Sequence, residues 1–244
     1  MARQFIAYGE ERIGFTVRFQ PRPRQRVAIH VMPDGAVQVD APLDTEIAAV
    51  KDAVRQRARW IWQQLQAHRE RQRHVMPREY VSGETHFYLG RRHMLKVQLA
   101  PAGAGAGVRL WRGRLEVSTP QRDAATVRRL LEAWYRAHAG EVFARVLAEV
   151  AQRMRLRGAE PPPWRLLAMR TQWGSCSPKG ELLLNPLLVK APRACIEYVV
   201  AHELCHLTEH NHSPRFYGLL GAVLPDWAER KAELDGLAEQ LLNR

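Results

Sequence analysis

The hydrophobic pattern divides the chain into a strand-rich first half and a helix-rich second half. Between residues 13 and 40, apolar and polar side chains alternate in three short runs, which predicts a three-stranded meander. The turn between the last two runs is predicted at Pro33-Asp34-Gly35. Residues 44–65 repeat apolar side chains at helical spacing, with Asp44 as the expected N-cap. A second alternating segment, residues 80–118, predicts further strands.

Longer helical patterns follow in the second half. Residues 122–155 form one amphipathic stretch, and the three prolines at 161–163 prevent a helix from continuing past them. The apolar run Leu182–Leu184 predicts a strand, and Pro192 marks the start of the next helix. Two more helix starts are predicted by the N-cap residues Ser213 and Asp226.

This order of elements predicts an α+β fold. The Thr119-Pro120 step suggests that residues 1–118 form a β-rich N-terminal subdomain, which contains one long helix. The remaining residues, 119–244, are expected to form a catalytic subdomain, and the two parts are either separate or one integrated unit.

The chain is strongly basic, with a net charge of +12 that comes almost entirely from arginine. Guanidinium groups bind phosphate and carboxylate groups through two parallel hydrogen bonds, so the surface suits a nucleotide, a nucleic acid or an acidic partner. No zinc finger, helix-turn-helix or aromatic-interleaved basic motif is visible along the sequence.

The cysteine count and the apolar runs indicate a cellular compartment. Three cysteines without a C-x-x-C pair argue against a disulfide framework and against a cysteine-ligated zinc site. The sequence has neither a recognisable signal peptide nor an apolar run long enough to cross a bilayer. We therefore expect a reduced, cytoplasmic, soluble protein without a membrane segment.

The strongest chemical signal is an H-E-x-x-H motif at residues 202–206. Side chains four residues apart lie on one face of a helix, so His202 and His206 can bind one Zn²⁺ together. Glu203 is placed to reach a metal-bound water and take its proton as a general base. The motif predicts one metal ion, either zinc or another divalent metal.

His210 and His212 are the candidates for the third ligand. In a continuous helix His210 would lie ~12 Å along the axis from His202, too far to share its metal. Asn211 tolerates the left-handed conformation that ends a helix, and His212 then directly precedes the helix start at Ser213. This spacing favours His212 over His210.

The motif and its surroundings resemble a known family over residues 170–217. Trp173-Gly174-Ser175-Cys176-Ser177, the H-E-x-x-H motif, Asn211-His212-Ser213 and Phe216 are similar to the signature of the YgjP-like predicted metal-dependent hydrolases, which are relatives of the SprT-like zincins. The resemblance implies a zincin-like fold, with His202, His206 and His212 as ligands and Glu203 as base. Glu209 stands where the metzincin pattern has glycine, so the chain is not a metzincin.

The residues before the H-E-x-x-H helix are expected to form a wall of the site. Leu182–Leu184 is predicted to be the edge strand in front of the helix. Arg170, Trp173 and Ser175 are candidate substrate-binding residues, with Arg170 as an anion clamp. The alternative is that Trp173 packs in the core and the segment forms an ordinary turn around it.

These observations predict a zinc-dependent, metallopeptidase-like hydrolase. A peptide substrate fits an edge strand, because an extended chain binds such an edge by β-pairing. The resemblance also implies a nucleoside triphosphate pyrophosphohydrolase, with UTP in particular, on the same metal site. A third alternative is a nucleic-acid-associated binding protein or protease that uses the arginine-rich surface.

Overall fold

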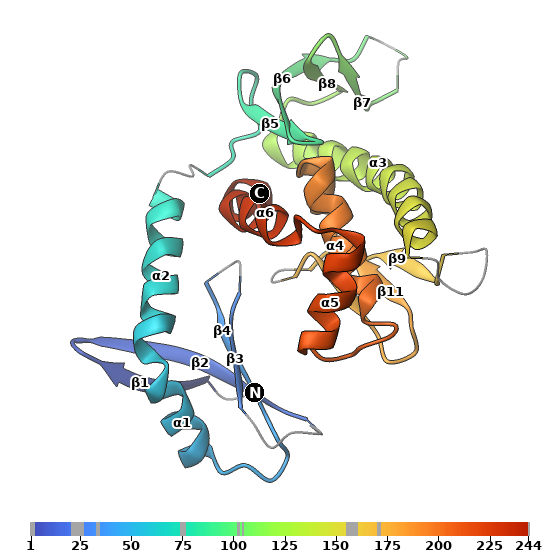
Figure 1. Ribbon diagram of the computed structural model, residues 1–244. Coiled ribbons are helices and arrows are strands. Elements are labelled where there is room, and N and C mark those ends of the chain that lie inside the picture. Colours follow the sequence, from blue (N-terminus) through green and yellow to red (C-terminus); the bar gives the residue numbers. More distant parts are fainter. Residues whose placement is uncertain are drawn as a thin grey trace. The chain divides into compact units, whose positions relative to one another are not determined.

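A computed structural model of the chain describes residues 3–20, 27–32, 35–73, 77–101, 103, 105–154, 161–169 and 172–243. The chain folds into two compact units, Met1–Met76 and Pro77–Arg244, each with a hydrophobic core of its own (Figure 1). The mixture of sheets and helices confirms the α+β class. Among the described helices, none combines the length and the apolar character needed to cross a bilayer.

The first unit is a four-stranded sheet covered by two helices. The predicted strands are present, and a further strand precedes them. However, the strand order is β1-β2-β4-β3, with β2 parallel to β4, so the predicted meander is wrong. Alternation specifies which face a strand buries, but not which strand becomes its neighbour. The elements are β1 (Arg3–Tyr8), β2 (Glu11–Phe19), β3 (Ala28–Val31), β4 (Val37–Ala41), α1 (Ile47–Gln56) and α2 (Ala58–Arg73).

The connections within this unit agree in part with the sequence pattern. β3 and β4 are antiparallel, and Gly35 takes a positive φ of 77° in their turn. The other two residues of the predicted turn, Pro33 and Asp34, lie outside the described residues. The single predicted helix is divided at Arg57, and Glu46, not Asp44, occupies the N-cap position of α1.

The second unit begins with a sheet of order β5-β6-β8-β7, of which β6 and β8 are parallel. Its inner face, which includes Leu95, Leu115 and Val117, belongs to the core that forms around α3. α3 continues through Gly140 without a break, because a single glycine in a helix costs only ~1 kcal/mol. The elements are β5 (Thr85–Tyr88), β6 (Arg91–Leu99), β7 (Gly107–Trp111), β8 (Arg114–Thr119) and α3 (Ala124–Arg153).

This sheet is joined to the C-terminal elements by hydrogen bonds. The backbone N–H groups of Leu89 and Gly90 donate to the carbonyls of Val189 and Lys190, at 2.9 and 3.0 Å. The hydroxyl of Tyr135 donates to a carbonyl of β5 at 2.9 Å. The compact units therefore divide at 76/77 and not at the 118/119 boundary expected from the Thr-Pro step, because the second group of strands shares the core of the helices.

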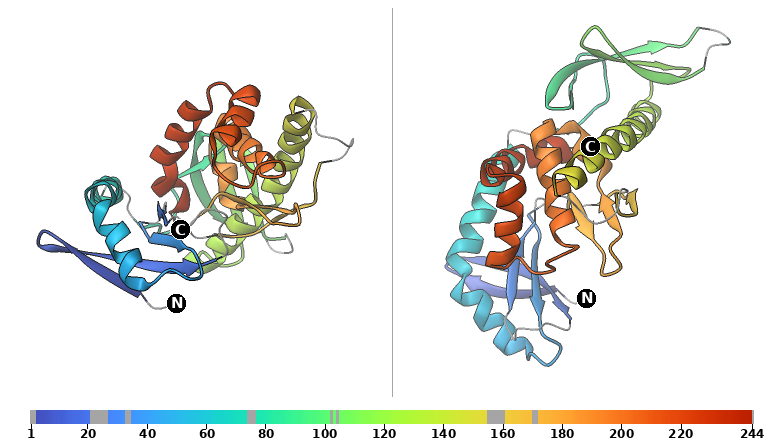
Figure 2. Two further views of the ribbon diagram at one scale, coloured as in Figure 1. Left: turned by 60° about the horizontal axis from the view of Figure 1, so that its bottom comes forward. Right: turned by 45° about the vertical axis from the view of Figure 1, so that its right-hand side comes forward.

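The C-terminal elements complete the second unit (Figures 1 and 2). A short helix and α4 both pack against α3, and α4 also contacts α5 and α6. The predicted helix starts at Pro192, Ser213 and Asp226 agree with the helices observed. The elements are β9 (Trp164–Leu166), β10 (Gly174–Cys176), β11 (Leu182–Leu184), the 3-10 helix η1 (Pro186–Lys190), α4 (Arg193–Cys205), α5 (Pro214–Val223) and α6 (Trp227–Leu242).

The small sheet beside α4 has the order β10-β11-β9, with β11 in the centre. Leu182–Leu184 is therefore not the edge strand that the sequence suggested. Leu182 and Leu184 are fully buried, and such a continuous apolar run is typical of an internal strand. The edge strand in contact with α4 is β10, inside the W-G-S-C-S motif.

Candidate metal and catalytic site

Helix α4 carries the two histidines of the motif at the border between its buried and exposed faces. Ile196, Val200 and Leu204 are fully buried in the core. His202 and His206 remain partly accessible. The regular helix ends at Cys205, so that His206 is its C-cap and the chain turns away directly after it.

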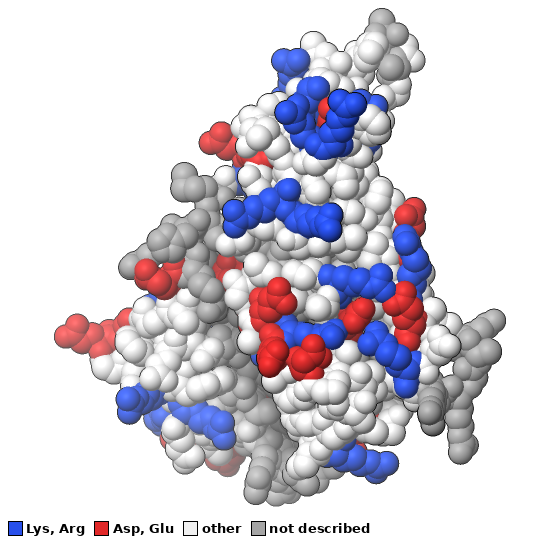
Figure 3. All heavy atoms as spheres, turned by 45° about the horizontal axis from the view of Figure 1, so that its top comes forward, with Lys and Arg blue, Asp and Glu red and all other residues white. Residues whose placement is uncertain are grey.

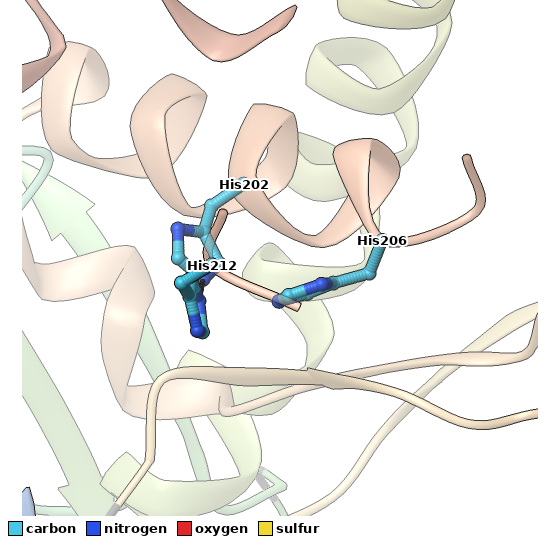
Figure 4. Close-up of side chains that lie close together, drawn as sticks. All are labelled: His202, His206 and His212. Carbon is cyan, nitrogen blue, oxygen red and sulfur yellow. Dashed lines mark hydrogen bonds between the residues drawn. The ribbon is translucent and has the colours of Figure 1, made fainter. Parts of the chain in front are cut away.

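His212 approaches the two helix histidines from the segment that follows. Its Nε2 atom lies 2.9 Å from Nε2 of His202. One nitrogen from each of His202, His206 and His212 lies within 4.8 Å of the others. Figure 4 shows the three imidazole rings converging on one side of α4. Within the described part of the chain, this is the only such group of histidine, cysteine or acidic side chains.

The turn after α4 decides which histidine joins the pair. Thr208 and Glu209 close it by donating their N–H groups to the carbonyl of Cys205. His210 lies in the turn, exposed, and is not part of the group. His212 directly precedes Ser213, whose hydroxyl caps α5 by accepting the N–H of Phe216. The start of α5 therefore fixes the backbone next to His212.

Phe216 supports all three rings. Its side chain is fully buried, and its ring centroid lies 4.9, 4.7 and 4.7 Å from those of His202, His206 and His212. Sequence reasoning noted this phenylalanine only as part of a motif. Helical spacing does not predict this contact, because His212 lies outside α5.

Burial holds His202 and His206 in the neutral form that metal binding requires. Burial, followed by the neighbouring His212 and His206, lowers the pKa of His202 to about 3. Burial also lowers the pKa of His206, against the opposing effect of its hydrogen bond to Glu209. His206 Nδ1 lies 3.1 Å from the carbonyl of Glu209, so Nδ1–H donates to this oxygen and Nε2 keeps its lone pair. Three convergent imidazoles fit a zinc ion in both donor type and number.

Glu203, next to His202 in α4, packs against Gly174 of β10. It is 6 % exposed, and burial raises the pKa of its carboxyl to about 8. The backbone N–H of Cys176 donates to this carboxylate and acts in the opposite direction on its pKa. A Cβ atom added to Gly174 would lie 2.7 Å from Cγ of Glu203, so only glycine leaves room for the carboxylate there.

The register of β10 explains this arrangement. In the antiparallel pair with β11, Ser175 lies opposite Leu183. The hydrogen bonds from Asn185 N–H to Trp173 and from Ser177 N–H to Glu181 show that the odd-numbered residues bond to β11. By alternation, the backbone groups of Gly174 and Cys176 face away from β11. The N–H of Cys176 is consequently available to Glu203.

The three candidate substrate residues have different surroundings. Trp173 is 9 % exposed and belongs to the core, which supports the packing interpretation, although its Nε1 has no hydrogen-bond partner among the described groups. Ser175 is partly exposed in β10. Arg170 lies outside the described residues. Sequence reasoning missed the contributions of Gly174 and of the Cys176 backbone, which no side-chain pattern indicates.

Comparison with known proteins identifies a family whose model matches this chain. The YgjP-like metallopeptidase domain matches residues 25–236, a range that includes the W-G-S-C-S motif and all three histidines. No curated protein sequence matches the chain. The crystal structure of the metallopeptidase zymogen of Pyrococcus abyssi abylysin is similar at 20% identity and a TM-score of 0.34, over 38% of this chain and 90% of the crystallised chain.

Proposed function

The chain belongs to the YgjP-like metallopeptidase family, and on that premise we propose that it is a zinc-dependent hydrolase that cleaves peptide bonds. His202, His206 and His212 are the proposed ligands, and Glu203 is the proposed general base. The observation that carries this proposal is the convergence of three imidazole nitrogens within 4.8 Å, one residue away from a buried carboxyl.

Zinc is the metal that suits this donor set. Three imidazoles would hold the ion, and three protein ligands are typical of catalytic zinc sites. When bound, the zinc ion acts as a Lewis acid that polarises the scissile carbonyl and makes a water molecule more acidic. The carbonyl of Glu209 accepts the Nδ1–H of His206 and so leaves Nε2 of His206 as the nitrogen that would bind the metal.

Glu203 is suited to moving the proton. Burial raises its pKa to about 8, which strengthens its carboxylate form as a base; in that form it would accept a proton from the attacking water and then donate it to the leaving amine. The Cys176 N–H and the close contact with Gly174 hold the carboxyl in one place. The backbone of β10 is in this way part of the catalytic arrangement.

An extended peptide is the substrate that this strand supports best. Among the described strands, β10 has a strand partner on one side only. On its other edge the N–H of Cys176 is bonded to Glu203, so the remaining backbone groups of that edge are the ones proposed to pair with a peptide. A peptide bound along this edge would lie beside Glu203. The residue that would favour a nucleoside triphosphate, Arg170, lies outside the described residues, and nucleotide hydrolysis therefore serves as the contrasting activity in the test.

The test compares Glu203→Gln with the wild-type protein after zinc loading. Loss of a general base should lower the rate of casein hydrolysis by ~10²–10⁴-fold. Zinc content, measured by mass spectrometry, should stay at one ion per chain, since Glu203 is not a proposed ligand. Glu141→Gln, an exposed carboxylate on α3, is the matched control and should keep full activity. Hydrolysis of UTP but not casein by the wild type would contradict the peptide substrate, and absence of bound zinc would contradict the whole proposal.

A further inference from the structure

The outer face of the β5–β8 sheet is a basic surface with exposed aromatic and apolar side chains. Its strands bury one face against α3, while the opposite face is largely exposed. At the top of Figure 3, lysine and arginine side chains gather over this sheet around a small acidic area. We name this surface the outer sheet face. It consists of Phe87, Arg92, Met94, Lys96, Arg109, Trp111, Arg112, Arg114 and Glu116.

The strand register arranges these side chains in rows. In one row, Arg114 lies opposite Met94 on β6 and opposite Trp111 on β7. In the next row, Glu116 lies between Lys96 and Arg109 and accepts a hydrogen bond from each, at 3.4 and 2.9 Å. The row on the other side pairs Phe87 with Arg92. Cationic and apolar side chains thus alternate across the strands, although they are far apart along the chain.

The charge of the face is one-sided. It carries five cationic side chains and one carboxylate, and that carboxylate, Glu116, is 7 % exposed beneath its partners. Its pKa is lowered, first by the hydrogen bond from Arg109, so Glu116 remains charged and holds the guanidinium in place. The cations that are left over favour an anionic partner.

Trp111 is the exposed aromatic side chain of this face. It is 52 % exposed, and the guanidinium carbons of Arg109 and Arg112 lie 5.8 and 5.6 Å from its ring centroid. Arg112 has a positive φ of 45° in the turn between β7 and β8, a conformation that favours glycine or asparagine. A second aromatic ring, Phe87, is only partly exposed and also packs against the core, and the guanidinium carbon of Arg92 lies 5.9 Å from its ring centroid. By strand spacing the two edge strands that carry these rings lie ~14 Å apart.

We propose that the outer sheet face binds single-stranded nucleic acid. Flat aromatic rings accept unstacked bases, and adjacent guanidinium groups bind the phosphates that connect them. A four-stranded sheet that presents an exposed ring, here Trp111, is a surface on which single strands bind by stacking. A duplex keeps its bases stacked inside, so it can use the cations but not the rings. This function is independent of the metal site.

Fluorescence anisotropy of the full-length protein with a labelled single strand of ~15 nucleotides tests the proposal, since sheet-based sites span ~4–16 nucleotides. Trp111→Ala should weaken binding by roughly 5- to 100-fold, because one stacked base is lost. The matched control is Trp60→Ala, which removes a 42 % exposed tryptophan of α2 and should leave the affinity unchanged. Equal effects of the two variants, or none from Trp111→Ala, would overturn the proposal.

A second pair of variants separates this site from a general effect of charge. Arg92→Gln/Arg114→Gln should reduce the salt dependence of binding by ~0.7 per lost phosphate contact. Arg129→Gln/Arg145→Gln removes the same charge from exposed positions of α3 and should preserve that dependence. A duplex of the same length should bind more weakly than the single strand. Equal or tighter binding to the duplex would show that the rings take no part. Tighter binding to vesicles of anionic phospholipid would identify a membrane surface as the partner. Either result would overturn the proposal.

Discussion

Gly174→Ala tests whether the backbone of β10 positions Glu203. Gly174 is not among the glycines with a positive φ, so alanine can adopt its backbone conformation without strain. The added Cβ atom would lie 2.7 Å from Cγ, 2.9 Å from Oε1 and 3.1 Å from Cδ of Glu203. Of these contacts, the one with Cγ sets the required movement.

The size of the effect follows from these distances. Non-bonded carbon atoms pack at ~3.5–4.0 Å, so Glu203 must move by roughly 1 Å. Such a movement also lengthens the hydrogen bond that its carboxylate accepts from Cys176. A misplacement of ~1 Å in a catalytic arrangement costs ~100-fold in rate. We therefore expect kcat/KM to fall by about 100-fold, and the free energy of unfolding to fall by ~1–3 kcal/mol through overpacking.

Casein hydrolysis with zinc quantification is the assay. Zinc content should remain at one ion per chain, because the added methyl group contacts Glu203 and not the three histidines. Gly140→Ala is the control, since its Cβ would meet no atom within 4 Å, and it should keep full activity and gain up to ~1 kcal/mol of stability. Wild-type kcat/KM in a zinc-loaded Gly174→Ala protein would refute the argument. Loss of zinc would mean that the substitution disturbs α4 itself.

Two other predictions concern the histidines. His212→Ala should lower zinc affinity by more than ~100-fold, which exceeds the cost of removing a residue that only supports a ligand. His210→Ala should leave the affinity unchanged. A competition assay with a chromogenic chelator measures both, and equal losses would contradict the ligand assignment. Burial, followed by neighbouring cations, lowers the pKa of His86 from 6.5 to about 3, so below pH 6.5 the unfolded chain binds a proton that the folded chain does not. His86 thus contributes stability that is complete above pH 6.5 and is lost as the pH falls, by ~1.4 kcal/mol between about pH 7.5 and 5.5. In urea unfolding, His86→Gln, which can still donate to Glu84, should reduce the pH dependence by that amount, and an unchanged pH dependence would contradict it.

The helices were predictable because their signals are local. Pro192, Ser213-Pro214 and Asp226 each mark a helix start within one turn of the chain. The exclusion of His210 and the convergence of His212 on the α4 pair agree with the rise of a helix. Sequence reasoning works at these positions because the residues that decide the structure are close neighbours. The expected left-handed turn at Asn211 is wrong, because α4 already ends at Cys205 and Asn211 does not have a positive φ.

The strand pairings were not predictable because they depend on distant segments. The edge position of β10 arises from the parallel pairing of β9 with β11, across residues that lie between 166 and 182. The outer sheet face depends even more on segments that are distant along the chain. Its rings and cations come from four strands and alternate only after β6 pairs with β8, so no aromatic-interleaved basic motif exists along the chain.

The position of the Glu203 carboxyl also depends on a buried side-chain amide that lies outside the W-G-S-C-S and H-E-x-x-H motifs. Asn185 is fully buried, and its Nδ2 donates to the carbonyls of Met169 and Gln172 at 2.8 and 3.0 Å. Its Oδ1 accepts the N–H of Leu187, while its own N–H donates to Trp173. These bonds fasten the chain just before β10 to η1, which packs on α3 and α4. Since Gly174 follows Trp173 directly, the hydrogen bonds of Asn185 set the strand against which Glu203 is held.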